Sequence, residues 1–253
     1  MLFDSHTHVD TIRCEDIEMM AVSGVRRLML CTGPNGATVH TTLLDYYEQL
    51  LTTHATRVRD RGITPYVAIG VHPLSIPRDY EQALNRLPSS LKRNPVAAIG
   101  EIGIHKGDDT EQTAFQKQLE IAKDNEAPVI VHTPMLEKKK IVQIILNILR
   151  QTGVDMRKVI VDHSSMEVVR EIVDAGANVG LTLRKDMLSS EDAYEILREN
   201  SEHVVLGSDA NGLRPSDPLA VSKFSWYCRL KGLDEKEFQK ASWDNPNRIF
   251  DLE

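Results

Sequence analysis

Cysteine is scarce in this sequence of 253 residues, which contains only three. Cys14, Cys31 and Cys228 are far apart, and their odd number and wide spacing predict neither a disulfide framework nor a zinc ribbon. Free thiols of this kind are typical of a reducing cytosol, so we expect a cytoplasmic protein. The polar, histidine-containing start of the sequence also lacks the pattern of a signal peptide.

Long apolar runs and an excess of positive charge are missing as well, and aromatic residues are few. No segment approaches the roughly 20 apolar residues that a membrane-spanning helix needs, so we expect no membrane insertion. Aromatic residues make up 5% of the chain and do not alternate with basic residues, as a platform for single-stranded nucleic acid would require. The formal net charge of −7 disfavours non-specific binding of nucleic acid, although a local basic site is compatible with it.

The chain has no low-complexity tract, long linker or change of composition, so we expect a single domain over residues 1–253. Short apolar runs alternate with longer amphipathic segments, a pattern that favours buried parallel strands connected by helices. The predicted strands are residues 2–6, 26–31, 64–71, 96–101, 128–132, 158–163, 178–182 and 203–209. The clearest helical patterns cover residues 41–62, 110–127 and 165–176.

Eight strands separated by helices in about 250 residues predict a (β/α)8 barrel, the TIM-barrel fold. An open doubly wound sheet is the alternative, but it usually has a glycine-rich turn after its first strand, and this sequence has none. In a (β/α)8 barrel the active site lies at the carboxyl ends of the strands. Polar residues at those ends are therefore the candidates for function.

Histidines and carboxylates stand at most of these strand ends. His6 and His8 are two residues apart in the first strand and therefore share a face. Buried ionisable groups are costly unless they are paired or bind metal, and imidazole with carboxylate suits zinc or another divalent transition ion. Two ions are possible, with Glu101 as a bridge and Asp209 as a ligand and general base. The other strand ends supply His72, His132 and His163.

Several short motifs follow one another along the chain: FDSHTHVD, GVHP, AIGEIG with QTAFQKQLEIAK, PVIVHT, DHSS, GSDA and NPNRIF. In this order they resemble the TatD-like metal-dependent hydrolases, a branch of the amidohydrolase superfamily, over nearly the whole chain. The resemblance implies a hydrolase with two divalent ions, Zn²⁺ foremost, with Mn²⁺, Ni²⁺, Fe²⁺ or Mg²⁺ as alternatives. It implies one ion held by His6, His8, Glu101 and Asp209, and another held by Glu101, His132 and His163.

Other positions depart from the pattern of the nucleases in that family. In GEIGIHKG, His105 stands where those nucleases have an aspartate, and Pro134 stands where they have an arginine after the histidine. The candidate metal ligands are therefore kept while the residues around them differ. These differences favour hydrolysis of a small polar or anionic molecule and disfavour nucleic acid as the substrate.

Further polar and basic residues are expected around the same pocket. One or two cations there would suit a carboxylate or a phosphate on the substrate. A role as solvated charges at the rim is the alternative for the basic residues, and a structural role is the alternative for the histidines. The candidate substrate-binding residues are His72, His105, Lys138, Arg184 and Arg214.

The sequence favours hydrolysis of an ester, amide, lactone or phosphoester by water that the metal site activates, with Asp209 and Glu101 as the catalytic residues. A TatD-type deoxyribonuclease acting as a 3′–5′ exonuclease is one alternative. A non-hydrolytic metal enzyme, such as a one-metal deaminase or decarboxylase, is another. A catalytically silent barrel that binds metal is the third, although structural zinc sites usually close with four Cys or His ligands.

Overall fold

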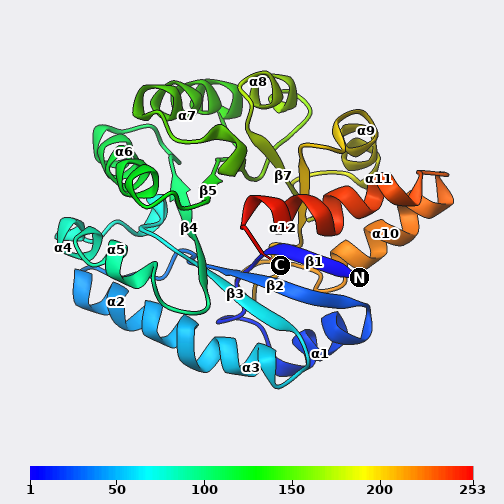
Figure 1. The fold of residues 1–253 in the computed structure, drawn as a ribbon, viewed down its shortest axis with the longest axis horizontal. Coiled ribbons are helices and arrows are strands. Elements are labelled where there is room, and N and C mark those ends of the chain that lie inside the picture. The colour runs from blue at the N-terminus through cyan, green and yellow to red at the C-terminus, as the bar shows by residue number, and fades with distance from the viewer. Residues whose placement is uncertain (253) are drawn as a thin grey trace.

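The structure, a computed structural model, describes residues 1–252. Eight parallel strands form one sheet in which neighbours follow the order of the sequence (Figure 1). The strands are β1 (Leu2–Thr7), β2 (Val25–Cys31), β3 (Thr64–Ile69), β4 (Val96–Gly103), β5 (Val129–His132), β6 (Val159–Val161), β7 (Asn178–Thr182) and β8 (Val204–Gly207). This is the predicted (β/α)8 barrel.

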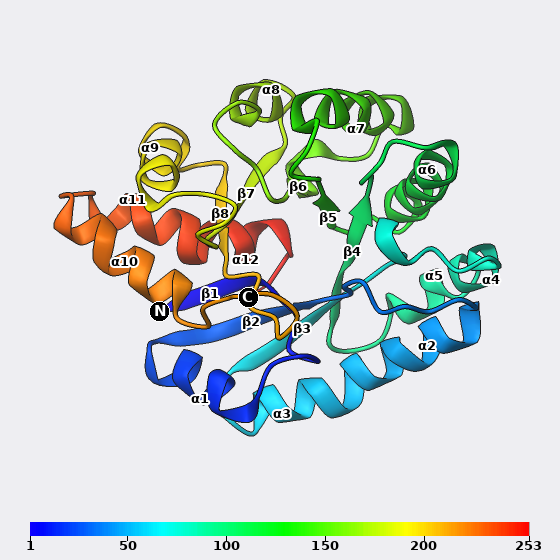
Figure 2. The same cartoon turned by 180° about the vertical axis from the view of Figure 1, so that it is seen from behind.

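Helices connect the strands and surround the sheet in both views (Figures 1 and 2). The α-helices are α1 (Cys14–Val22), α2 (His40–Gln49), α3 (Ala55–Arg59), α4 (Tyr80–Leu84), α5 (Leu87–Ser90), α6 (Asp109–Asp124), α7 (Lys138–Thr152), α8 (Val169–Asp174), α9 (Ser190–Asn200), α10 (Ala220–Leu230), α11 (Glu235–Gln239) and α12 (Asn245–Ile249). Single turns of other types are η1 (Leu50–His54), η2 (Pro73–Ser75), η3 (Met156–Lys158) and η4 (Lys240–Asp244).

The first and last strands meet just beyond β8 and complete the ring. A parallel bridge joins Thr7 to Ala210, and the amide of Asp209 donates to the carbonyl of His6 at 2.9 Å. The amide of His8 donates to the carbonyl of Ala210 at 3.0 Å. These backbone bonds bring the candidate ligands of β1 next to the one that follows β8.

Both faces of the strands are buried, as their continuous apolar runs predict. One apolar cluster takes residues from β1 to β6 and β8 and is the inner layer of the barrel; Phe3, Ile130 and Val205 belong to it. Ile249 and Phe250, at the end of the chain, belong to the same cluster and so close the end of the barrel where the strands begin. The candidate functional residues lie at the opposite end. A second cluster fills the space between sheet and helices.

The observed elements differ from the predicted ones mainly at their ends. The helix expected over residues 41–62 is interrupted by the π-turn η1, so that α2 and α3 are separate α-helical segments. The strand expected over 158–163 ends at Val161, and Asp162 and His163 lie beyond it. Within residues 1–252, no helix has the length and apolar character needed to cross a bilayer.

Candidate metal centre

The six predicted metal ligands lie together at the carboxyl end of the barrel, and the structure buries all of their side chains. Their convergence follows from the fold, because the ends of parallel strands in a closed barrel surround a single space. The residues are His6 and His8 from β1 and the segment after it, Glu101 from β4, His132 from β5, His163 after β6 and Asp209 after β8.

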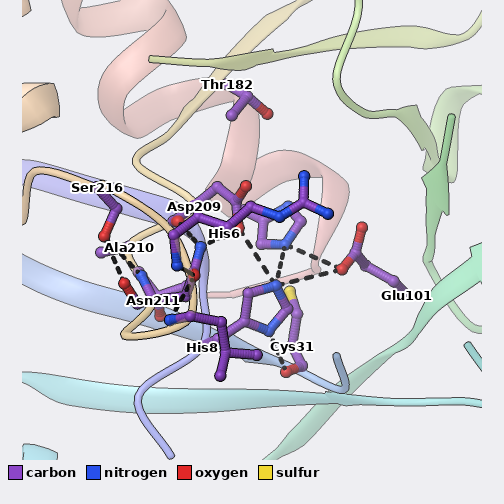
Figure 3. Close-up of polar contacts among 12 residues, drawn as sticks. His6, His8, Cys31, Glu101, Thr182, Asp209, Ala210, Asn211 and Ser216 are labelled. Carbon is purple, nitrogen blue, oxygen red and sulfur yellow. Dashed lines mark hydrogen bonds and ion pairs between the residues drawn. The ribbon is translucent and has the colours of Figure 1, made fainter. Parts of the chain in front are cut away.

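The carboxylate of Glu101 lies between two pairs of imidazoles and turns one oxygen toward each pair. Its Oε2 atom lies 3.2 Å from Nε2 of His6 and 3.4 Å from Nε2 of His8 (Figure 3). Its Oε1 atom lies 3.2 Å from Nδ1 of His132 and 3.0 Å from Nε2 of His163. One carboxylate thus faces two groups of nitrogen donors, which is the arrangement expected of a bridge between two metal ions.

The surroundings of Glu101 also fit a bound cation. Among residues 1–252, the ion-pair partners of this carboxylate are all imidazoles, including His72 at 3.7 Å from Oε2. Burial opposes ionisation of Glu101, but the charge of His6 and the hydrogen bonds from the rings hold the pKa of its carboxyl well below the usual range. A buried carboxylate needs positive charge beside it. Protonated rings such as His6 supply that charge when no metal ion is present, whereas histidines that bind a metal ion are neutral. A divalent ion would supply it.

Asp209 completes the part of the site next to β1. Its Oδ1 atom lies 3.3 Å from Nε2 of His8 (Figure 3). Its Oδ2 atom accepts a hydrogen bond of 2.5 Å from Nη1 of Arg184. Burial raises the pKa of the Asp209 carboxyl, but the hydrogen bond to His8 and the neighbouring imidazole charges outweigh burial and keep the pKa below its ordinary range. The carboxylate is therefore ionised at neutral pH and able to accept a proton.

Asp162 is a residue of the site that sequence reasoning missed. Its Oδ2 atom accepts a hydrogen bond from Nδ1 of His6, and its Oδ1 atom accepts one from the amide of His163 at 2.7 Å. A carboxylate on the far nitrogen of a histidine fixes the ring and its tautomer, as is usual for metal-binding histidines. The signal in the sequence is the pair Asp162-His163 at the end of the sixth apolar run, where the aspartate directly precedes the predicted ligand.

Two more contacts orient rings of the site. Nδ1 of His8 lies 3.1 Å from the carbonyl oxygen of Cys31, and Nδ1 of His163 lies 2.7 Å from Oγ1 of Thr182. Both rings therefore present Nε2 to the acidic residues. Gly33 packs so closely against His8 that a Cβ atom there would lie 2.8 Å from Nδ1, so a larger residue would displace the ring.

The backbone is unusual at two of the proposed ligands, and Lys138 donates a hydrogen bond to the carbonyl of one of them. His163 and Asp209 have left-handed conformations, with φ of 55° and 46°, which residues other than glycine adopt rarely and often at functional sites. The buried ammonium of Lys138 donates to the carbonyl of His163 and, at 3.2 Å, to Oγ1 of Thr133. Lys138 does not line the cavity. The expectation that it contacts substrate is corrected: it supports the segment that carries His163.

The predicted histidines of the pocket both line the cavity and both contact candidate ligands. Nδ1 of His72 accepts a hydrogen bond from the amide of Leu74 at 3.1 Å, which directs its Nε2–H toward Glu101. His105 lies with Nδ1 3.1 Å from Nε2 of His132. Their position matches the expectation, and their contact with substrate stays a prediction.

Arg184 and Arg214 line the cavity as well, in two different states. Arg184 is buried and held by carboxylates: Nε and Nη2 bind Asp186 at 2.9 and 2.8 Å, while Nη1 binds Asp209. Arg214 is exposed and approaches the cavity from the loop after β8.

The cavity has a volume of about 340 Å³, near the lower end of the range for small-molecule sites.

Comparisons with known proteins agree with this geometry. The family model described as TatD related DNase matches residues 3–251. A protein of Methanocaldococcus jannaschii named as an uncharacterized metal-dependent hydrolase is 32% identical over 253 residues, covering 99% of this chain and all of that protein. The crystal structure of a TatD-like protein from Archaeoglobus fulgidus matches with a TM-score of 0.85 and 27% identity, covering 99% of this chain and all of that one.

A more distant structure supports the fold alone. A phosphotriesterase homology protein from Escherichia coli has a TM-score of 0.77 at 16% identity, with 98% of each chain covered. The family model spans nearly the whole chain, and the relative from M. jannaschii covers it at more than 30% identity. The resemblance inferred from the sequence motifs is thereby confirmed. The chain belongs to the TatD-related DNase family and is a metal-dependent hydrolase.

Proposed function

We propose that the site holds two divalent ions, zinc foremost, with manganese, nickel, iron or magnesium as alternatives. One ion would be held by His6, His8, Glu101 and Asp209, and the other by Glu101, His132 and His163. The observation that carries this proposal is the division of the Glu101 oxygens between two histidine pairs. Bound there, such ions supply Lewis-acid polarisation of the substrate and activation of water.

The residues of the chain would then perform three tasks. Asp209, ionised at neutral pH, accepts the proton of the attacking water. Asp162 and Thr182 hold the rings of His6 and His163, so that these rings need not reorganise when substrate enters. Arg184 fixes Asp209, and Arg214, with His105 beside it in the cavity wall, would meet a negative or polar group of the substrate.

We propose a small polar or anionic molecule as the substrate, cleaved at an ester, lactone, amide or phosphoester bond. Three observations support this choice: the cavity volume of about 340 Å³, the net charge of −7, and the single exposed arginine in the cavity wall of the described residues. We further propose that residues 1–253 act as one domain in the cytoplasm, where the free thiols of Cys14, Cys31 and Cys228 would stay reduced.

A deoxyribonuclease is the second candidate, and the description of the matching family model favours it. A nuclease needs cations along the path of the phosphate backbone. In this chain the ammonium of Lys138 is buried and donates to the carbonyl of His163. The charge of Arg184 is balanced by the carboxylates of Asp186 and Asp209. These pairings leave the cavity with little charge for a polyanion.

The test is a hydrolysis screen of protein with defined metal content. Metal is removed with a chelator, one ion type at a time is restored, and the metal content is measured; we expect about two ions per chain. Activity is then compared on carboxyl esters, lactones, amides, phosphomonoesters and phosphodiesters, and on single-stranded DNA. We expect turnover of a small substrate that Asp209→Asn abolishes. Efficient exonucleolytic digestion of DNA, lost in Asp209→Asn and matched by no small substrate, would establish the nuclease instead.

A further inference from the structure

Large apolar side chains surround the mouth of the cavity above the candidate metal centre. They come from four loops at the carboxyl ends of the strands, and all of them line the same cavity. We name this set the apolar collar; it consists of Leu74 after β3, Met135 after β5, Met187 after β7 and Leu213 after β8.

Three of the four collar residues are exposed, and Met187 is half-buried. Leu74 is 40%, Met135 46% and Leu213 69% exposed. Exposed apolar side chains scattered singly need no explanation, but a group of them around a concave site indicates a binding surface. Half of the ten large exposed apolar residues within residues 1–252 lie in loops after strands β3, β5, β6 and β8, on the face of the barrel that carries the site. Three of these five, Leu74, Met135 and Leu213, line the cavity itself.

The floor of the same cavity has the opposite character. It consists of the buried carboxylates Glu101 and Asp209 with their imidazole partners. A ligand that fills the cavity must therefore place a polar group at the floor and an apolar group at the collar. A wholly polar ligand would leave the collar in water, and a wholly apolar one would leave the carboxylates without compensation.

The collar residues also suit an alkyl chain better than a flat ring system. Leucine and methionine are flexible and aliphatic, and methionine adapts its shape to varied ligands. Trp226, Tyr227 and Phe224, which could stack on a ring, line a different groove between α9 and α10. The cavity volume of about 340 Å³ leaves room for a short chain beside the scissile group.

We propose that the substrate carries a short aliphatic acyl or alkyl group next to the bond that is cleaved, and that the apolar collar binds this group. The inference rests on the proposed function of the metal centre and names the class of substrate: aliphatic esters or lactones with a polar scissile group. The collar residues are thus residues that determine specificity, and they take no part in the bond-breaking step.

The first experiment varies the length of the acyl chain. The metal-loaded protein is assayed on a series of p-nitrophenyl esters from acetyl to octanoyl. We expect kcat/KM to rise by about two- to fourfold for each added methylene until the collar is filled, as burial of apolar surface predicts. In Met135→Ser/Leu213→Ser, the ratio of kcat/KM for hexanoyl to that for acetyl should fall by at least tenfold.

Two exposed apolar residues outside the collar provide matched controls. Leu230, at the end of α10, is 65% exposed, and Val22, at the end of α1, is 90% exposed. Leu230→Ser/Val22→Ser also changes two exposed apolar residues to serine, and its chain-length profile should equal that of the wild type. A profile that is flat in the wild type, or equally steep in the collar variant, would overturn the inference.

A binding measurement separates this inference from the proposed function. Alkyl hydroxamates of increasing chain length are titrated calorimetrically into the metal-loaded protein, because their head group binds metal without being hydrolysed. Affinity that rises with chain length in the wild type and not in the collar variant supports the collar, even if no ester is turned over. Affinity independent of chain length refutes the collar, while turnover of esters in the same preparation would leave the proposed hydrolase intact. Binding of single-stranded DNA that is lost in the collar variant would assign the surface to nucleic acid and refute the proposal.

Discussion

Nη1 of Arg184 lies 2.5 Å from Oδ2 of Asp209, so the proposed general base is hydrogen-bonded to a buried guanidinium. The other side of the same guanidinium binds Asp186, which is more than half exposed. Arg184 thus connects a carboxylate at the floor of the site to one at its rim. A charge-assisted bond of this kind is directional and fixes the oxygen that it contacts. The second oxygen of Asp209 remains directed at His8.

The first prediction concerns this support. Arg184→Met leaves Asp209 without its donor, and we expect kcat or metal affinity to fall by about 10- to 100-fold, as for other residues that orient metal ligands. Arg184→Lys, which keeps the charge, should recover part of the loss. The measurements are kcat and KM on a substrate found in the screen, and metal affinity by calorimetry. Asp186→Asn is the control, because it removes the outer partner only. Equal kcat and equal metal affinity in the wild type and Arg184→Met would show that Asp209 is held without Arg184.

The second prediction concerns the base itself. Asp209→Asn keeps an oxygen that can bind metal but cannot accept a proton, so we expect kcat to fall by about 10²- to 10⁴-fold. The fold and part of the metal binding should be kept, so kcat is compared at a measured metal content equal to that of the wild type, which separates loss of the base from loss of the site. Unchanged kcat with full metal content would mean that another group accepts the proton.

The third prediction concerns Asp162, which contacts the proposed ligands His6 and His163. Asp162→Asn weakens the hydrogen bond to Nδ1 of His6 and removes the negative charge behind that ring. We expect the affinity for one of the two ions to fall by about 10- to 100-fold. Calorimetric titration of the chelator-treated protein would measure it. Ser165→Ala changes a half-buried residue close by in the chain that contacts none of the proposed ligands, and it should bind both ions as the wild type does.

The sequence allowed the fold and the candidate ligands to be predicted, because both depend on local patterns. A parallel strand buried on both faces is a continuous apolar run, and the polar residue that ends the run marks the carboxyl end of the strand. His132 and Glu101 were located in this way without any knowledge of tertiary contacts. The role of these residues as metal ligands stays a prediction, as does the single domain over residues 1–253.

The contacts behind the ligands could not be predicted, because they join residues that are far apart in the sequence. Asp162 binds a histidine 156 positions away, and Arg184 binds a carboxylate 25 positions away. Lys138 was expected in the pocket because its loop reaches the rim. Its side chain instead turns inward and donates to the carbonyl of His163, a residue that lies beyond the end of β6. The direction of a long side chain depends on such partners, which apolar periodicity does not reveal.

The last prediction tests the buried state of Lys138 through the pH dependence of stability. Burial lowers the pKa of its ammonium to about 8 from an ordinary 10.5, against the opposing attraction of Asp162 and Glu167. Between these two pH values, the unfolded chain binds a proton that the folded chain has released. The free energy of unfolding should therefore rise with pH across this window, by up to about 3 kcal/mol at about 1.4 kcal/mol per pH unit. Below pH 8 both the folded and the unfolded chain carry the charge of Lys138. The full cost of burying this charge then lowers the free energy of unfolding.

Lys138→Met removes this titration, so the free energy of unfolding of the wild type, minus that of Lys138→Met, should increase from pH 8 to pH 10.5. Urea unfolding of both metal-loaded proteins at several pH values in this window measures the difference, and other titrating groups cancel from it. Lys138→Arg is the matched control, because arginine keeps its charge throughout this range; its stability relative to Lys138→Met should not change with pH. Parallel curves for the wild type and Lys138→Met would mean that the ammonium has an ordinary pKa and is accessible to water, contrary to its buried contact with the carbonyl of His163.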